Sequence, residues 1–285
     1  MPYLGLIFNA MVWGLSWWPL RQLHALGLHP LWATALFFLI GLVLTLAWQP
    51  SAWTDFRRCR ALWVLALAAG ATNTAFNWAV SIGEVVRVVL LFYLMPLWAV
   101  LLAWLMLGER LTWAALGRVL LALAGAWLVL RPVDAAWPVF SGLPDVLAVG
   151  GGFGFALTNV LLRQQAHRSA SARSLAMFLG AALLPGVLAY GLAAQGIIPS
   201  WPAWDVRWVL GAAALGLTVV AANVALQYSA ARLPVQISSV VMLTEILFAA
   251  GSAVWLAGEM LTPTLLIGGA LISLAALLTA REGVS

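Results

Sequence analysis

The sequence contains one short motif twice, as Leu107-Gly108-Glu109-Arg110 and again as Ala257-Gly258-Glu259-Met260. Each copy ends a long apolar run, and the second copy begins 150 positions after the first. Asn73 and Asn223, inside two earlier apolar runs, are separated by the same offset. The sequence therefore predicts two related halves, each made of several apolar segments.

The composition places both halves in a membrane. Hydrophobic residues make up 64% of the chain and charged residues only 8%, whereas soluble domains average about 25% charged residues. The arginines are scattered over short segments, which argues against a nucleic-acid surface. The apolar run that starts at Tyr3 follows no basic stretch, so we expect a retained first span and no cleaved signal peptide.

Ten apolar segments are long enough to be considered as membrane spans, because a helix needs about 20 residues to cross a bilayer. Prolines punctuate the connections between them, where they begin or end helices. The predicted spans are residues 3–20, 30–48, 61–80, 85–106 and 113–130 in the first half, and 143–163, 173–193, 207–228, 235–257 and 263–280 in the second. No stretch remains for a soluble domain.

Five spans per half is an odd number, so equivalent spans must cross the membrane in opposite directions. Arginine counting sets the orientation, because cytoplasmic loops are enriched in basic residues. With the N-terminus inside, nine arginines fall in cytoplasmic loops and four in outer loops, while Arg118 lies within the fifth span. We therefore predict cytoplasmic termini and an inverted repeat, the arrangement of many secondary transporters.

Several motifs resemble the EamA repeat of the drug/metabolite transporter (DMT) superfamily. Those that carry the resemblance are Leu107–Thr112, Ala257–Thr262, the opening Trp13-Gly14-Leu15-Ser16, and the helix-breaking step Met95-Pro96. The segment Leu243–Ala249 is similar to the YddG-like amino-acid exporters. The second half has Glu245-Ile246 where the first has Met95-Pro96, so a gating role of Pro96 does not transfer to the ninth span.

The resemblance implies an all-α integral membrane protein with ten transmembrane helices in two inverted five-helix repeats. The first EamA repeat would occupy residues 1–131 and the second residues 143–281, joined by a linker at 132–142. It implies a secondary transporter, and no enzyme, that exports aromatic or broad neutral amino acids or related small metabolites by alternating access. The expected location is a bacterial inner membrane. We expect a monomer that contacts membrane lipid, uses no cofactor or metal and leaves proton coupling open.

Glu245 is the strongest single candidate for a residue of the functional site. It is predicted midway along the ninth span, where an ionisable group is costly and is a functional candidate by default. It would contact a substrate amine or bind a proton. The alternative is a neutral glutamic acid that is hydrogen-bonded between helices.

Two pairs of amides form the next candidates. Asn73 and Asn77 share one face of the third span, and Asn223 and Gln227 repeat the pattern in the eighth. Such amides could bind a carboxylate or a zwitterion across a central cavity. The alternative is interhelical hydrogen bonding that holds the bundle together.

The remaining candidates are aromatic, apolar or small residues at membrane depth, which suit the walls of a small-molecule pocket. The predicted substrate-binding set adds Trp13, Trp17, Trp78, Phe92, Met95, Asn159, Tyr228 and Met242, and the predicted gating or hinge positions are Pro96 and Gly152. For each, ordinary helix packing is the alternative. Gly108 and Gly258 are expected to turn the chain, and Glu109 and Glu259 to favour the start of the following helix.

Two other functions compete with amino-acid export. An integral membrane enzyme is disfavoured, because the three histidines lie at or beyond span ends and Glu245 is the one central carboxylate. A multidrug or nucleobase carrier would keep the fold and change the cargo. A phosphate-binding loop is absent from the sequence, which has no lysine, so transport must draw on gradients.

Overall fold

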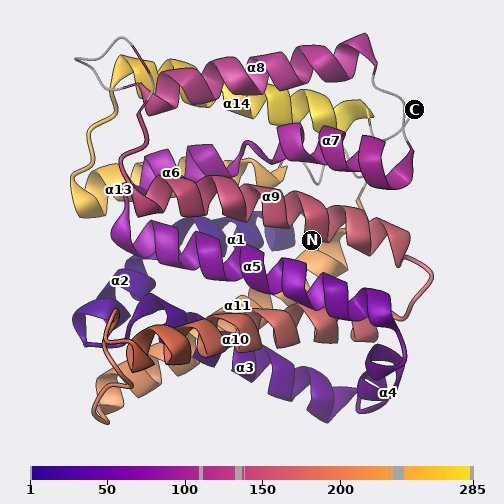
Figure 1. The fold of residues 1–285 in the computed structure, drawn as a ribbon, viewed down its shortest axis with the longest axis vertical. Coiled ribbons are helices and arrows are strands. Elements are labelled where there is room, and N and C mark those ends of the chain that lie inside the picture. Colours follow the sequence, from indigo (N-terminus) through magenta and orange to yellow (C-terminus); the bar gives the residue numbers. More distant parts are fainter. Residues whose placement is uncertain are drawn as a thin grey trace.

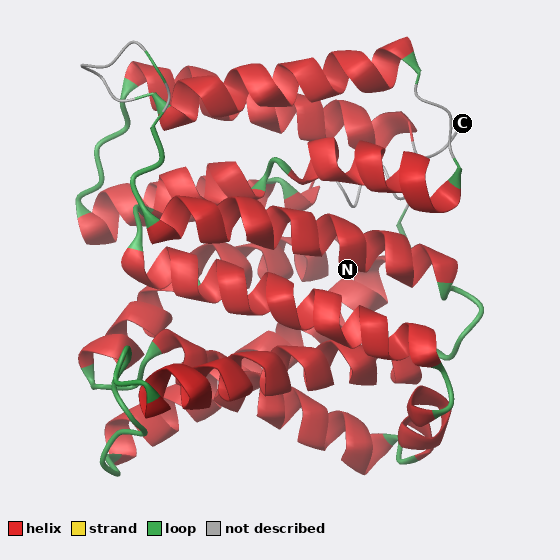
Figure 2. Ribbon diagram, viewed as in Figure 1, coloured by secondary structure: helices red, strands yellow, loops and turns green. Residues whose placement is uncertain are grey.

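The computed structural model describes residues 2–108, 112–131, 137, 139–230, 232–233 and 241–282. Helices joined by short loops make up this part of the chain (Figure 2). The first half contains α1 (Pro2–Leu15), α2 (Trp17–Ala25), α3 (Pro30–Trp48), α4 (Ser51–Arg57), α5 (Arg60–Ile82), α6 (Val85–Phe92), α7 (Met95–Leu107) and α8 (Trp113–Leu130). The second half contains α9 (Leu143–Gln164), α10 (Ala170–Ala194), α11 (Val206–Ala230), α13 (Thr244–Ala257) and α14 (Pro263–Glu282).

Helices occupy each predicted span wherever the structure describes it. In the described part of the chain, six stretches are apolar and long enough to cross a membrane, by length and composition: Pro30–Trp48, Val85–Leu107, Trp113–Leu130, Leu143–Gln164, Ala170–Ala194 and Val206–Ser229. Residues 235–240, most of the predicted linker at 132–142, and Glu109 lie outside the described residues. The all-helical membrane fold is confirmed, and the count of ten spans stays a prediction.

The fourth and ninth predicted spans are both broken near their middle. α6 ends at Phe92 and α7 begins at Met95, directly before Pro96, so the break expected at this proline is present. In the ninth span, Leu243 forms a turn between helical Met242 and α13, although no proline is there. The Thr244 hydroxyl donates instead to the Val241 carbonyl at 2.6 Å and so satisfies a backbone acceptor at the break.

The two glycines of the repeated motif adopt the same backbone conformation. Gly108 has φ 68° and Gly258 has φ 66°, both in the left-handed region that glycine enters without strain. Each glycine ends its helix, α7 or α13, as expected. The Glu259 carboxylate does not cap the following helix α14, however. It accepts from the Val85 and Val86 N–H groups at 2.8 and 3.1 Å and so caps α6.

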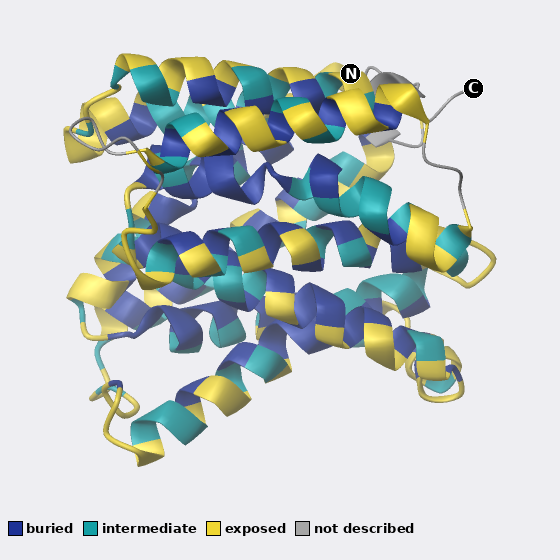
Figure 3. Ribbon diagram, turned by 45° about the horizontal axis from the view of Figure 1, so that its top comes forward, coloured by how far each residue is buried: buried dark blue, intermediate teal, exposed yellow. Residues whose placement is uncertain are grey.

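The helices lie side by side with their ends gathered at two sides of the molecule (Figure 1). α5 packs between α9 and α10, and α8 and α14 pair along one edge. Gly70 and Gly180 permit the close approach of α5 and α10, since a Cβ on Gly180 would collide with the Ala66 carbonyl. Buried residues line the interior and many outward positions are exposed (Figure 3). Exposed Leu105 and Val187 suit contact with lipid.

Candidate functional site

The two helix breaks meet at a hydrogen bond between Tyr93 and Glu245. The Tyr93 hydroxyl donates to Glu245 Oε2 at 3.1 Å, and both side chains are buried. Tyr93 directly follows α6, and Glu245 is the second residue of α13. A polar contact thus joins the interrupted fourth and ninth predicted spans. The sequence pointed to Glu245 but missed Tyr93, although its position two residues before Met95 at the break was a usable signal.

Helices α1 and α2 bring further polar groups to α13. The buried Asn9 amide donates to the Met242 sulfur at 3.5 Å, and the Trp17 indole N–H donates to the Ser252 hydroxyl at 2.9 Å. The backbones are in close contact, because a Cβ on Gly14 would lie 2.7 Å from the Glu245 carbonyl oxygen. The structure therefore places Trp17 and Met242, with Asn9 and Ser252, on the segments around Glu245, and a role for them in binding cargo stays a prediction.

Glu245 has no cationic partner among the described residues. α13 packs mainly against α1 and α6. α1 carries no charged side chain, and the one charged residue of α6, Arg87, is bound to Asp145. Arg21 of α2 pairs with Glu259 instead. A buried carboxylate without a counter-charge is costly, so this position suits a ligand or proton that supplies the positive charge.

The break between α6 and α7 is packed against α9 by aromatic rings and glycine. The Phe92 ring lies 4.7 Å from Phe76 and 5.6 Å from Phe155, between centroids. A Cβ on Gly152 would lie 2.4 Å from the Phe92 carbonyl oxygen, so only glycine permits this approach. Met95 packs against an apolar cluster that contains Ala156 and Val160 of α9. The structure thus shows a packing contact for Gly152, and its hinge role stays a prediction.

The two predicted amide pairs have different surroundings. Gln227 donates to Asn223 Oδ1 at 2.6 Å and to the Ser174 hydroxyl at 3.5 Å. Asn73 donates to the Ala69 carbonyl of its own helix at 2.9 Å. Asn77 is fully buried, and neither atom of its amide has a hydrogen-bond partner in the described part of the chain. The pairs therefore do not form one symmetric site around Glu245.

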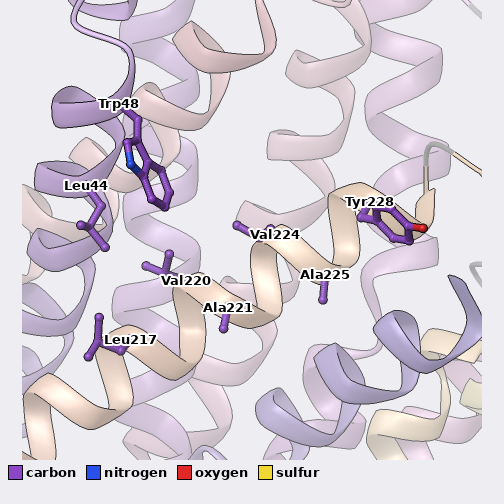
Figure 4. A pocket seen from close by; sticks show the side chains of 8 residues that line it. All are labelled: Leu44, Trp48, Leu217, Val220, Ala221, Val224, Ala225 and Tyr228. Atoms are coloured by element: carbon purple, nitrogen blue, oxygen red, sulfur yellow. The ribbon is translucent and has the colours of Figure 1, made fainter. Parts of the chain in front are cut away.

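Asn223 and Gln227 line a groove between α3, α10 and α11, here named the open groove, of about 380 Å³. Its lining carries hydrogen-bonding side chains without charge: Thr45, Gln49, Ser169, Ser171, Ser174, Asn223 and Gln227. An apolar extension of about 620 Å³ follows α11, where Leu44 and Trp48 lie opposite Leu217, Val220 and Val224 (Figure 4). The open groove lies where α3 ends, close to α4 and the start of α10, an end of the molecule we call the Trp48 end.

Aromatic side chains separate the open groove from the helix breaks. Phe178, in the groove wall, lies 6.2 Å from Phe38, which stacks at 6.4 Å on Trp13 of α1. Trp13 directly precedes Gly14, the residue in backbone contact with Glu245. The predicted site residue Trp13 therefore lies between the groove and the Tyr93–Glu245 contact.

Three predicted site residues lie elsewhere. Trp78 packs edge-on against His29, with ring centroids 5.6 Å apart. The Tyr228 ring lies in the apolar extension under the Arg232 guanidinium, 3.7 Å away. Asn159 is exposed and donates to the Phe155 carbonyl of its own helix. The structure does not bring these three together with Glu245, and a cargo contact for them stays a prediction.

Polar contacts close the opposite end of the molecule, here named the Glu259 end. Arg21 donates to the carbonyls of Val80 and Gly83 and lies 3.7 Å from the Glu259 carboxylate. Arg87 forms a bidentate ion pair with buried Asp145, with a shortest distance of 2.8 Å. Sequence reasoning missed Asp145, although an acidic side chain within a predicted span was a usable signal.

Comparisons with known proteins agree with this picture. Residues 1–131 match the model of the EamA-like transporter family. An uncharacterized transporter of Archaeoglobus fulgidus is 30% identical over 216 residues, which cover 74% of this chain and 73% of that protein. A solved crystal structure aligns with a TM-score of 0.63 over 100% of this chain and 99% of the other, at 21% identity. At that identity the structural likeness shows the fold alone.

Proposed function

The chain belongs to the EamA-like transporter family of the drug/metabolite transporter superfamily, and from this premise we propose that it exports amino acids or related small metabolites by alternating access. The observation that carries the proposal is the Tyr93–Glu245 hydrogen bond, which joins two broken helices in the interior. Broken helices that meet at mid-membrane are typical of secondary-transporter binding sites.

The proposed topology is ten spans in two inverted repeats, with α1–α2 and α6–α7 each counted as one span. The repeated break and the matching Gly108 and Gly258 conformations support related halves. Gly83 lies beside Pro144 and Gly154 beside Thr72, so α5 and α9 run antiparallel. That is the direction expected for the third and sixth of ten spans.

The proposed cargo carries a positively charged amine. Glu245 supplies a buried carboxylate without a cationic partner among the described residues, and the Tyr93 hydroxyl occupies the position that a cargo ammonium group would take. The Trp17 and Phe92 rings near the two breaks suit an apolar or aromatic side chain. This combination favours neutral amino acids, and the resemblance of Leu243–Ala249 to the YddG-like exporters supports the same cargo.

The proposed setting is a bacterial inner membrane with both termini in the cytoplasm. The Trp48 end would then be cytoplasmic, because the arginine-rich connections around Arg58 and Arg168 lie there. The open groove would face the compartment from which an exporter collects its cargo. Ten spans suffice to enclose a transport route, so the proposed unit is the monomer. Transport would be driven by an ion or proton gradient or by the concentration gradient of the cargo itself.

A carrier of organic cations is the second candidate, because the absence of a cation beside Glu245 also suits a cargo without a carboxylate. Counterflow in proteoliposomes separates the two. Vesicles loaded with unlabelled phenylalanine or leucine should accumulate the same amino acid when it is added outside in labelled form. Vesicles loaded with unlabelled tetraphenylphosphonium or a nucleobase should not accumulate the labelled form of that compound. Accumulation of the organic cation alone would replace the amino-acid assignment with the second candidate.

A further inference from the structure

The open groove has a closed counterpart in the other half of the chain. We propose that Asn73, Thr74 and Asn77 line a second cargo groove between α3, α5 and α10, which is shut here and opens at the Glu259 end in the opposite-facing state. It would take the carboxylate of the cargo. The inference rests on the proposed alternating access and deepens it by naming residues that contact cargo on the release side.

The offset of 150 positions relates the two grooves residue by residue. Subtracting it from the α11 wall of the open groove, Val220, Asn223, Val224 and Gln227, gives Gly70, Asn73, Thr74 and Asn77 of α5. The start of α10, which lines the open groove with Ser171 and Ser174, is equivalent in the predicted repeat to the start of α3, which begins at Pro30. Adding it to Trp48 of α3 gives Ile198, just after α10. The helices α3, α5 and α10 thus correspond to α10, α11 and α3.

Equivalent residues differ sharply in exposure. Trp48 is 73% exposed, and its counterpart Ile198 is 9% exposed in a cluster with Leu31 and Ala189. Val224 is 54% exposed, and its counterpart Thr74 is 6% exposed. The walls that carry Trp48 and Val224 are therefore apart, and the equivalent walls that carry Ile198 and Thr74 are packed together. This relationship is expected when the two halves exchange conformations during transport.

The closed counterpart contains buried polar atoms without partners. The Asn77 amide nitrogen and oxygen and the Thr74 hydroxyl lack hydrogen bonds in the described part of the chain. Unpartnered buried groups destabilise a protein, and few are retained without a reason. A groove that fills with water or cargo in the opposite-facing state supplies that reason, because the same atoms are then satisfied.

Arg21 and Glu259 form the latch that holds the closed counterpart shut. The Arg21 guanidinium donates to the Val80 and Gly83 carbonyls at the end of α5, while Glu259 caps α6 from the far half of the chain. Among the described residues, the lining of the open groove contains no matching cation. When Arg21 separates from Glu259 and from the end of α5, its guanidinium would become available in the second groove. A guanidinium pairs well with a carboxylate, so the carboxylate of the cargo is assigned to this groove.

Reciprocal cysteine labelling tests the proposal. In a Cys59→Ala background, Gln227→Cys should react rapidly with a soluble methanethiosulfonate, and Asn77→Cys or Thr74→Cys should react slowly. Adding Glu259→Gln should raise labelling at 77 and 74 several-fold and lower labelling at 227. Asp205→Asn, in an exposed ion pair with Arg207, is the control and should change neither.

Two outcomes would contradict the second groove. In the first, Glu259→Gln does not change the labelling rate at positions 77 and 74. In the second, it raises the labelling rate at positions 77, 74 and 227 together. The first outcome would mean that the second groove does not open, and the second would mean that the substitution loosens the whole helix bundle. Reporters at both 74 and 77 keep the test decisive if one variant does not fold. Counterflow of amino acids is scored separately, so a wrong cargo and a wrong groove give different results.

Discussion

Tyr93 and Glu245 lie 152 positions apart in the chain, and the hydroxyl of the first donates to the carboxylate of the second at 3.1 Å. Each lies beside a helix break, one in each half. Their hydrogen bond therefore links the halves at the point where the backbone is already interrupted. Such a contact can be exchanged for a cargo contact with little disturbance of regular helix.

Replacing Tyr93 with phenylalanine should destabilise the cargo-free protein. The change removes a buried hydrogen bond to a carboxylate and should lower the free energy of unfolding by about 1–3 kcal/mol. Thermal unfolding in detergent, followed by tryptophan fluorescence, measures the effect. Tyr190→Phe, at an exposed position on α10, is the matched control. Equal melting temperatures for the two variants would show that the Tyr93 hydroxyl contributes nothing.

The Arg87–Asp145 ion pair should be among the costliest to break. Asp145 is 1% exposed, so Arg87→Ala leaves a buried charge unpaired, at a cost of about 3–5 kcal/mol. Replacing both residues with alanine should cost less than the sum of the single changes. Melting temperatures of the three variants give the comparison. Arg207→Ala, which breaks an exposed pair, should leave the melting temperature unchanged, and additive losses at 87 and 145 would refute the pairing.

Gly152→Ala should disturb the break between α6 and α7. Its Cβ would meet the Phe92 carbonyl oxygen at 2.4 Å, and overpacking of this kind costs about 1–3 kcal/mol. Gly150→Ala, in the same helix, meets open space and is the control. The pair is compared by melting temperature and by counterflow rate. If alanine is tolerated equally at both positions, α9 does not pack on the break as described.

His29 should make stability depend on pH. Burial, and secondarily the nearby His24, lower the pKa of His29 from 6.5 to about 4. The unfolded chain therefore binds a proton that the folded chain refuses, so stability is complete above pH 6.5 and declines as the pH falls toward 4. Protonation also removes the acceptor that His29 Nδ1 offers to the Leu31 N–H. His29→Asn should reduce the change of melting temperature between pH 7.5 and 4.5. If the variant shows the same change as the wild-type protein, other groups cause the pH dependence.

Local features of the fold followed from the sequence, and distant contacts did not. Apolar length placed the helices, Pro96 indicated a break, and Gly108 and Gly258 indicated turns, because each depends on nearby residues. Glu259 was expected to favour the next helix but caps α6, since its partner was fixed by packing between the halves. Nor could repeated amides reveal that Gln227 is open and Asn77 buried, because that difference belongs to one conformational state.

Glu245 is proposed to bind the amine of the cargo. Counterflow of labelled phenylalanine against unlabelled phenylalanine or N-acetylphenylalanine, in wild-type and Glu245→Gln proteoliposomes, tests it most directly. If Glu245 binds the amine, exchange is expected with phenylalanine alone, with at least about a tenfold loss in Glu245→Gln, equivalent to about 1.4 kcal/mol. Equal exchange with the acetylated compound, or full activity of Glu245→Gln, would contradict it.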